Sequence, residues 1–393
     1  MKTMKWKFYS LAFVAGMSIL TACSSDDNND NDGNGGNGNG NEIENGTILK
    51  GTITSDVTLA AGNTYKLSGE YIVEEGGTLH IEEGVKIIAV YDDIADYILV
   101  KQGGKINAVG TPDKPIVMTS EKEEPGAWGG IHICGRAHTN AEGGKGSSEI
   151  GGAVYGGNDD ADNSGTLQYI RLEYTGFAFD EEHEANGISF YGVGNGTIVD
   201  HCQAYKGSDD GFEFFGGSVN VSNLVAVSCS DDSFDWTEGW NGKGTNLVAY
   251  QEAESTLGYD CDCLMECDNN GSNNAATPVA HPVLKNLILV GNGGSKQGIR
   301  LRAGTEVEID NAKVCGKGQP LTVETALTEN ALKNGTSKLT NITLTSELSC
   351  KEGIYTHADF IAVTSNKVDA NLSYSSFEDI RKECSWMNGN WVK

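Results

Sequence analysis

The sequence repeats a short segment at a fixed interval. Residues 208–214 read Ser-Asp-Asp-Gly-Phe-Glu-Phe, and residues 230–236, 22 positions later (230 − 208 = 22), read Ser-Asp-Asp-Ser-Phe-Asp-Trp. A period of this length is typical of stacked structural units. Aromatic residues alternate with acids in both copies, as in a strand with one face in a core, so we expect Glu213 and Asp235 to face outward. The aromatic residues predicted to face inward are Phe212, Phe214, Phe234 and Trp236.

Similar segments recur through the body of the chain. Residues 72–79 match 99–106 at an offset of 27, and residues 186–192 match 210–216 at an offset of 24. The chain contains 52 glycines but only 6 prolines, which suits many tight turns. Coils of about 22–27 residues with parallel strands predict an all-β fold, a right-handed parallel β-helix, over residues 47–393.

The end of such a stack needs a cover, because its edge has unpaired backbone groups. The segment Ser375–Glu378 resembles a capping box, which predicts a short helix ending near Cys384. We expect this helix and the segment Trp386–Trp391 to form the C-terminal cap.

The first residues predict an export signal. Three lysines precede an apolar run at residues 8–20, which is too short for a permanent membrane span. The segment Leu20–Cys23 resembles a lipobox, so we expect a lipoprotein signal peptide over residues 1–22 and a lipid on Cys23, which would attach the protein to a membrane. The alternative is an ordinary secretory signal followed by a coincidental cysteine.

Residues 23–46 are rich in Asn, Asp and Gly, and residues 24–42 are predicted to bury nothing, so we expect a flexible tether. Acidic residues directly after a lipidated cysteine resemble the surface-export signal of lipoproteins in the Bacteroidetes. That resemblance implies an outer-membrane protein that is exposed at the cell surface.

The formal net charge of −27 restricts the partners of the chain. It argues against nucleic acid and anionic lipid surfaces. It favours bound cations or neutral and cationic ligands, and the plainer alternative is a solvated acidic surface.

Residues 128–130, 210–217 and 231–240 together resemble a group of β-helix surface lipoproteins of the Bacteroidetes. The resemblance covers most of residues 51–393. It implies the right-handed, pectate-lyase-like β-helix fold, and it carries no known activity with it.

The repeated acids suggest a cation site. Stacked strands lie about 4.8 Å apart, so outward acids of neighbouring coils can share one Ca²⁺ or another divalent ion. The alternative is that these acids cap the backbone amides of corners. The predicted metal ligands of this region are Asp209, Asp210, Glu213, Asp231, Asp232, Asp235 and Glu238.

A second candidate calcium site begins at Asp160. Asp160, Asp162, Ser164 and Gly165 fit the first half of a calcium-binding loop, but Arg171 stands where the final Glu is expected. The alternative is an Asx-rich turn.

Three aromatic residues are candidate platforms for a sugar ring: Trp240, Trp128 and Tyr259. Trp240 is the preferred candidate because glycines and an asparagine flank it, as in an exposed turn. The alternative for all three is a place in the core.

Polysaccharide lyases and hydrolases also use this scaffold. A lyase needs cation-binding acids beside a basic residue, and Arg300 and Arg302 are the candidates. A hydrolase needs two or three carboxylates around one glycosidic bond. If the protein is an enzyme, the acids that we expect to take part are Asp209, Asp210, Asp231 and Asp232.

Of the ten cysteines, nine remain once Cys23 carries a lipid. Cys261, Cys263 and Cys267 lie close together in the sequence, where a local disulfide is expected in preference to a zinc site.

These observations favour a surface-anchored lipoprotein that binds an extracellular ligand, a glycan in preference to a protein, without catalysis. The alternatives are a calcium-assisted lyase or hydrolase acting on uronic-acid polymers, and a structural or adhesive surface protein.

Overall fold

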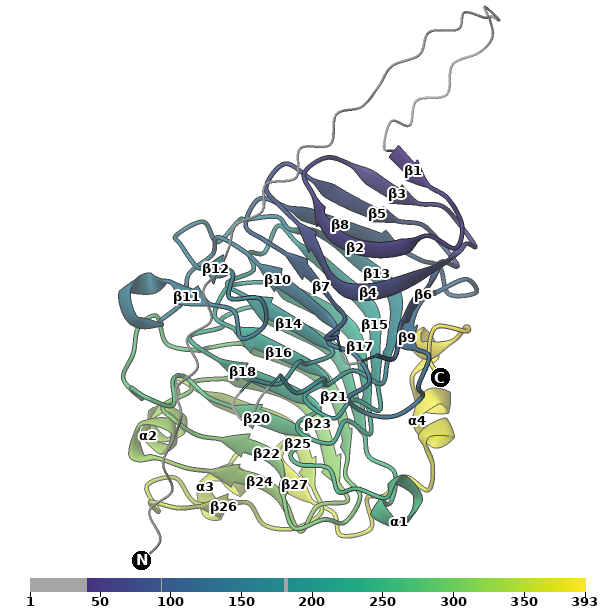
Figure 1. The fold of residues 1–393 in the computed structure, drawn as a ribbon. Coiled ribbons are helices and arrows are strands. Elements are labelled where there is room, and N and C mark those ends of the chain that lie inside the picture. The colour runs from purple at the N-terminus through teal and green to yellow at the C-terminus, as the bar shows by residue number, and fades with distance from the viewer. Residues whose placement is uncertain (1–40, 93, 180–182) are drawn as a thin grey trace, which may run out of the picture. The chain divides into compact units, whose positions relative to one another are not determined.

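One sheet of parallel strands winds through the chain. The computed structural model describes residues 41–92, 94–179 and 183–393. Within these residues 25 strands join a single sheet, and each pairs in parallel with the strand one coil away, as in the series β14, β16 and β18 (Figure 1). This confirms the predicted fold class, a parallel β-helix.

The sheet has three faces, which we call A, B and C. Face A begins with β1 (Asn41–Ile43), β3 (Val57–Leu59), β5 (Thr78–Ile81) and β8 (Lys105–Val109). Face B begins with the first parts of β2 (Ile48–Ile53) and β4 (Thr64–Val73), then β6 (Lys86–Ala89) and β9 (Ile116–Ser120), and it ends with β27 (Lys367–Val368). From residue 165 onward one bent strand in each coil serves both faces: β13 (Gly165–Glu173), β15 (Ile198–Tyr205), β17 (Asn220–Val227), β19 (Lys243–Tyr250), β21 (Val283–Val290), β23 (Glu308–Cys315) and β25 (Lys338–Leu344).

Face C continues from the second parts of β2 and β4, and it later carries the candidate site. Its further strands are β7 (Tyr97–Val100), β10 (Ile131–Cys134), β14 (Ile188–Tyr191), β16 (Phe212–Phe215), β18 (Phe234–Thr237), β20 (Met265–Cys267), β22 (Gln297–Leu301), β24 (Gln319–Val323) and β26 (Ser349–Cys350). A small hairpin of β11 (Gly146–Ser147) and β12 (Val154–Tyr155) lies outside this sheet.

A single left-handed residue makes the bend between faces A and B in each coil. Its φ lies between 53° and 64°, and the strand pairing passes over it on both sides. Asparagine tolerates this region better than most residues, because its short polar side chain can bond locally. The residues at the bend are Tyr169, His201, Asn223, Asn246, Asn286, Asn311 and Asn341.

The predicted aromatic stack fills the core. Phe212 pairs in register with Phe234, and their rings lie 5.6 Å apart at an angle of 13°. Phe214 stacks between Phe190, at 5.0 Å, and Trp240, at 4.2 Å. Residues that are separated by one period are therefore neighbours in space, as the repeat predicts.

The helices are short and lie outside the sheet. The α-helices are α1 (Glu254–Leu257), α2 (Ala326–Asn334), α3 (His357–Ala362) and α4 (Phe377–Glu383), and two 3-10 helices lie at Glu142–Gly144 and Ser385–Met387. Among the described residues, no helix is both long enough and apolar enough to cross a membrane.

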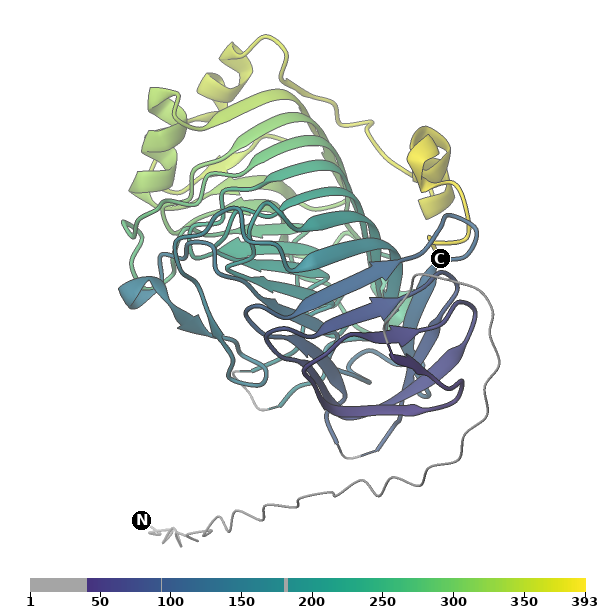
Figure 2. The same ribbon diagram turned by 90° about the horizontal axis from the view of Figure 1, so that it is seen from above.

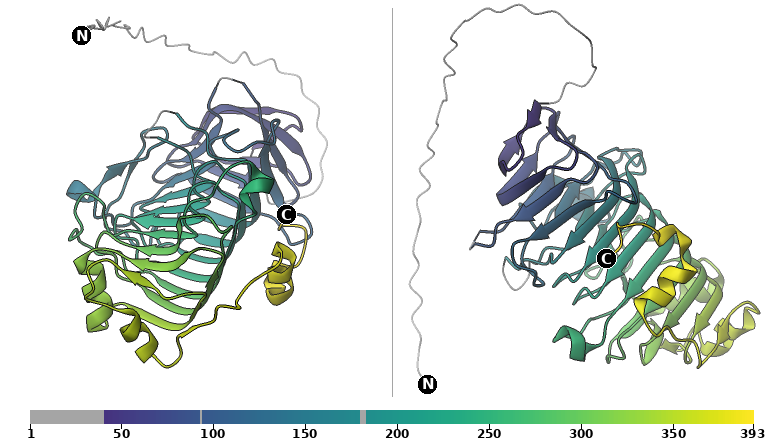
Figure 3. Two further views of the ribbon diagram at one scale, coloured as in Figure 1. Left: turned by 90° about the horizontal axis from the view of Figure 1, so that it is seen from below. Right: turned by 90° about the vertical axis from the view of Figure 1, so that its right-hand side faces the viewer.

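The predicted C-terminal helix is present as α4, but it does not cover the end of the stack. It lies along face B, where Ile380 packs against Val227 and Val290 in one apolar cluster (Figures 2 and 3). Ser376 makes no side-chain capping bond at its start. The end of the main core is instead closed by α3, whose Phe360 is fully buried and belongs to the main core cluster.

The C-terminal segment returns to the middle of the stack because its last residues bind there. The guanidinium of Arg171 donates to the carbonyl of Asn390 over 2.8 Å, and the Lys393 ammonium lies 3.1 Å from the Glu173 carboxylate. We call residues 369–393 the C-terminal strap.

Regular structure begins earlier than predicted. Strand β1 pairs with β3 and lies inside the segment that was expected to be a tether ending at residue 46. The expected signal peptide, Cys23 and most of the tether lie outside the described residues.

Replacing one ring of the aromatic stack should destabilise the whole fold. We expect Phe234→Ala to lower the free energy of unfolding by about 3–5 kcal/mol, because the cavity would lie between paired coils. Leu327→Ala is the control, since Leu327 is 49% exposed on α2 and should change stability by less than about 0.5 kcal/mol. Equal effects in equilibrium denaturation would contradict the stacked-core account.

Candidate functional site

Face C presents the acids of the repeat on its outer surface. The alternation that buries Phe212 and Phe234 turns Glu213 and Asp235 away from the core, and these two acids pair in register. The outward row that they belong to reads Ser189, Glu213, Asp235, Glu266, Arg300 and Thr322. Acids of successive coils are therefore stacked next to one another, as the repeat predicts.

These acids line a cavity of about 390 Å³, which we call the acidic groove. Corner residues before the strands of face C and two more distant loops complete its wall. The wall consists of ten acids and one arginine: Glu149, Glu184, Asp209, Asp210, Glu213, Asp231, Asp232, Asp235, Asp262, Glu266 and Arg300.

Two of the groove acids also support corners. One oxygen of Asp210 accepts the backbone N–H of Asp232 at 2.8 Å, and one oxygen of Asp232 accepts the backbone N–H of Cys263 at 2.6 Å. Both side chains nevertheless line the groove. Asp210 and Asp232 therefore cap corners, which was the alternative to a cation site, and they also lie among the acids of the groove.

At one end of the groove, arginine and lysine side chains form ion pairs with the acids. Arg300 lies 2.7 Å from Glu266 and 3.1 Å from Glu324, and Lys296 pairs with Asp262. Toward the N-terminal coils several groove acids lack such ion-pair partners within the described residues. Among the described parts of the chain, no ion pair is formed by the carboxylates of Asp209, Asp210, Glu213 and Asp235.

Burial and mutual repulsion raise the pKa values of this unpaired end. Burial, followed by the charges of Asp231 and Glu184, raises the pKa of Asp209 to about 7. Burial likewise raises the pKa of Glu149 to about 7. Glu213 and Asp235 have pKa values well above the usual range, first through burial and then through neighbouring carboxylates. At neutral pH the groove therefore favours uptake of protons or cations.

The acids form overlapping sets that fit a divalent cation. In each set the ligand atoms lie within 4.8 Å of one another. Three sets contain only carboxylates, and carboxylate oxygen is the ligand type that Ca²⁺ and Mg²⁺ prefer. These sets are Asp209–Asp210–Asp231, Asp210–Glu213–Asp235 and Asp232–Asp235–Glu266.

Asp235 is shared by two of these sets, and within the described part of the chain its buried Oδ1 has no hydrogen-bond partner. A buried carboxylate oxygen without a partner is costly. A cation bound there would supply the missing interaction, so the residues present fit a resident divalent ion.

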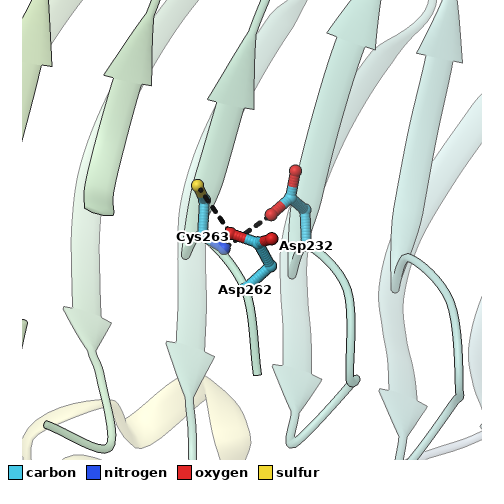
Figure 4. A group of neighbouring side chains, drawn as sticks. All are labelled: Asp232, Asp262 and Cys263. Atoms are coloured by element: carbon cyan, nitrogen blue, oxygen red, sulfur yellow. Dashed lines mark hydrogen bonds between the residues drawn. The ribbon is translucent and has the colours of Figure 1, made fainter. Parts of the chain in front are cut away.

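A fourth set contains a thiol and is less suited to Ca²⁺. Figure 4 shows Asp232, Asp262 and Cys263, in which the Cys263 thiol lies 3.3 Å from the Asp262 carboxylate and donates to it. Burial raises the pKa of Cys263 above its usual range, so the sulfur keeps its proton. A protonated thiol is a poor metal ligand.

Three predicted metal ligands do not reach the groove. Glu238 has a φ of 54° and accepts hydrogen bonds from Thr139 at 2.7 Å and Tyr155 at 2.8 Å, because the chain turns at the end of β18. Asp160 binds His138 at 2.6 Å. Asp162 belongs to none of the converging ligand sets found within the described ranges.

Two of the three predicted sugar platforms are wrong, and Tyr259 stays a prediction. Trp240 and Trp128 are each only 1% exposed, so neither can stack on a sugar. Gly239, with a φ of 85°, turns the chain after β18 so that Trp240 enters the core and donates to the carbonyl of Val219. Tyr259 is half-buried, and its hydroxyl donates to the carbonyl of Ser228 at 2.8 Å.

The candidate lyase bases are both held in ion pairs. Arg302 lies 2.7 Å from Asp268 and also pairs with Glu266. Burial lowers the pKa of Arg300, but its bonds to Glu324 and Glu266 outweigh this and raise it above the usual value. A guanidinium that holds its proton this strongly is poorly suited to act as a base.

Several groove residues were missed in the sequence. Glu266 occupies the same place as Asp235 one coil later, but the coil is 31 residues long (266 − 235 = 31), because an insertion carrying α1 lengthens it. A search of the sequence that allowed repeats longer than 27 residues would have found Glu266 as the counterpart of Asp235. Glu149 and Glu184 come from loops that carry no repeat signal.

The predicted local disulfide is not formed. Cys261, Cys263 and Cys267 are free, buried thiols, as are most of the other cysteines in the described residues. Cys267 points into the core as part of face C, which explains why it does not meet Cys263.

The fold and groove define a parallel β-helix protein with an acidic surface on one face. Residues 51–392 match the family described as pectate-lyase-like beta helix domain, and the chain therefore belongs to this family. Neither the curated proteins nor the solved structures that were compared gave a match. The family fold is consistent with a carbohydrate-related protein.

The raised pKa of Asp209 has a consequence for stability. The folded state holds a proton on Asp209 up to pH about 7, whereas the ordinary pKa of an aspartate is 3.8, so this stabilisation is present at low pH and is lost as the pH rises from about 4 to about 7. We expect Asp209→Asn in chelator to stabilise the chain at pH 8 relative to wild type by on the order of 1–3 kcal/mol, and by much less at pH 5.

The measurement is thermal or chemical unfolding at both pH values, with Glu347→Gln as the exposed-acid control. A difference between wild type and Asp209→Asn that does not depend on pH would contradict the proposed burial of charge.

Proposed function

We propose that this protein is an outer-membrane lipoprotein, exposed at the cell surface, which binds an extracellular glycan in its acidic groove through bound Ca²⁺ and does not catalyse a reaction. The observation that carries the proposal is that two carboxylate sets share Asp235, whose buried Oδ1 has no hydrogen-bond partner among the described residues. Membership of a family with a pectate-lyase-like fold supports a carbohydrate ligand.

Calcium provides the link between an acidic surface and a glycan. Ca²⁺ takes about 6–8 oxygen ligands, and a set of three carboxylates leaves positions open to other oxygens. Hydroxyl or carboxylate oxygens of a sugar can fill them. Without the cation, the unpaired acids would repel any acidic sugar.

Binding is favoured over lyase chemistry because both candidate arginines are held in ion pairs. Arg300 and Arg302 are both tied to carboxylates at the end of the groove. They are suited to hold the C-terminal groove acids in place, and Glu266 is bound by both of them.

A glycoside hydrolase is the second candidate. The specific observation in its favour is that Asp209 and Glu149 have pKa values of about 7, which suits a general acid at neutral pH. A structural or adhesive role is the third candidate, in which Ca²⁺ only joins the coils.

Removing the central ligand should abolish cation-dependent binding. We expect Asp235→Asn to weaken Ca²⁺ binding at least about tenfold, since one carboxylate serves two sets. Retention on immobilised pectin and alginate should be lost in this variant and in wild type with chelator, and it should be unchanged in Glu347→Gln. Calorimetry and affinity electrophoresis are the measurements.

Three outcomes distinguish the candidates. Retention without release of reducing ends or unsaturated products supports binding. Product release that is lost in Asp209→Asn supports the hydrolase. Calcium binding that raises the melting temperature, with no retention on any glycan, supports the structural role and rejects the glycan proposal.

The membrane anchor has its own test. We expect Cys23→Ala to move the protein from the membrane fraction to the soluble periplasmic or secreted fraction, because a lipid on Cys23 would be the attachment. A variant that still sediments with membranes would show that another segment anchors the chain.

A further inference from the structure

A row of asparagine side chains follows the bend between faces A and B. The Nδ2 of Asn246 donates to Asn223 at 2.8 Å, that of Asn286 to Asn246 at 3.0 Å, and that of Asn311 to Asn286 at 2.8 Å. The left-handed backbone at each position brings these amides into line from coil to coil. We call this row the amide ladder.

The amide ladder does not use all of its hydrogen-bonding groups. Each asparagine has two N–H donors and an oxygen with two acceptor positions. The ladder uses one donor each of Asn246, Asn286 and Asn311. Asn286 and Asn311 are exposed. The ladder therefore offers donors and acceptors to a ligand at intervals of about 4.8 Å.

The C-terminal strap encloses part of the ladder in a pocket of about 200 Å³. Trp386 of the strap is half-buried, and its ring lies 6.2 Å from Trp391 and 6.4 Å from His201, which hold it beside the stack. The residues that line the pocket are Asn246, Asn286, Leu287, Ile288, Asn311, Lys313, Glu383, Cys384 and Trp386.

The charged groups of the pocket neutralise each other. Lys313 pairs with Glu383, and the Tyr374 hydroxyl donates to the same carboxylate at 2.8 Å. Apart from this ion pair, the pocket is lined by neutral asparagine amides, by apolar side chains and by the indole of Trp386. The pocket therefore has no charge with which to select an ionic ligand.

We propose that this pocket binds a single neutral sugar unit. Amides donate and accept hydrogen bonds, which matches hydroxyl groups that do the same, and the indole offers an apolar surface to the C–H face of a sugar ring. The volume is below the range of about 300–1,000 Å³ that is usual for larger ligands, so one ring fits. The pocket is independent of the acidic groove, which lies on face C and is lined by a separate set of residues.

The test is saturation-transfer NMR of the full chain, in chelator, with glucose, galactose, mannose and N-acetylglucosamine. We expect at least one of these sugars to bind saturably. Trp386→Ala should weaken its binding at least about tenfold, and Trp386→Phe should retain most of it. Asn311→Asp should also weaken binding, because it replaces an amide donor in the exposed part of the ladder.

Asn330→Asp, on α2 away from the pocket, is the matched control, and melting temperatures confirm that each variant folds. The proposal is overturned if no sugar in the panel binds saturably, if binding is the same in Trp386→Ala and Asn311→Asp as in wild type, or if binding needs Ca²⁺ and is lost in Asp235→Asn. The last result would assign the sugar to the acidic groove.

Discussion

Parallel pairing in register, with coils about 4.8 Å apart, places like residues above like residues throughout this protein. For aromatic side chains the arrangement is favourable, because nearly parallel rings such as Phe212 and Phe234 can stack with an offset within an apolar core. For asparagine it is also favourable, because one amide can donate to the next. For carboxylates the same geometry is unfavourable, since like charges are held at short distance.

The chain resolves this conflict differently along face C. In the C-terminal coils Arg300 and Arg302 neutralise Glu266 and Asp268. In the coils before them, Glu213 and Asp235 form no ion pair within the described residues, and Glu213 accepts a hydrogen bond from the side-chain amide of Asn186. The unneutralised part of the row is where protons or a divalent ion are required, which explains why the candidate site lies there and not along the whole face.

The repeat allowed the fold and the centre of the groove to be predicted, because a period reports which residues become neighbours. Glu213 and Asp235 were placed correctly for this reason. Trp240 was not, since its position depends on the turn at Gly239, which takes the indole into the core. Glu149 lies in a loop, and its approach to the groove depends on contacts that no local pattern encodes. The C-terminal helix was predicted, but its place along face B is set by contacts between distant residues such as Arg171 and Asn390.

Different kinds of polar side chain gather at different places on the three faces. Face C gathers acids, while the bend between faces A and B gathers neutral amides and, at Tyr169 and His201, stacked rings. Both surfaces arise because parallel pairing in register places similar residues above one another, acids on face C and amides at the bend between faces A and B. A protein built this way can present two extended surfaces of different polarity with few dedicated loops.

The most direct test of this account is a crystal structure of the full chain grown with calcium, measured at a wavelength where calcium scatters anomalously. The account predicts an anomalous peak about 2.3–2.6 Å from the carboxylate oxygens of Asp235 and of a neighbouring acid on the next coil. A groove without such a peak, in which these carboxyl groups share protons in short hydrogen bonds, would contradict it.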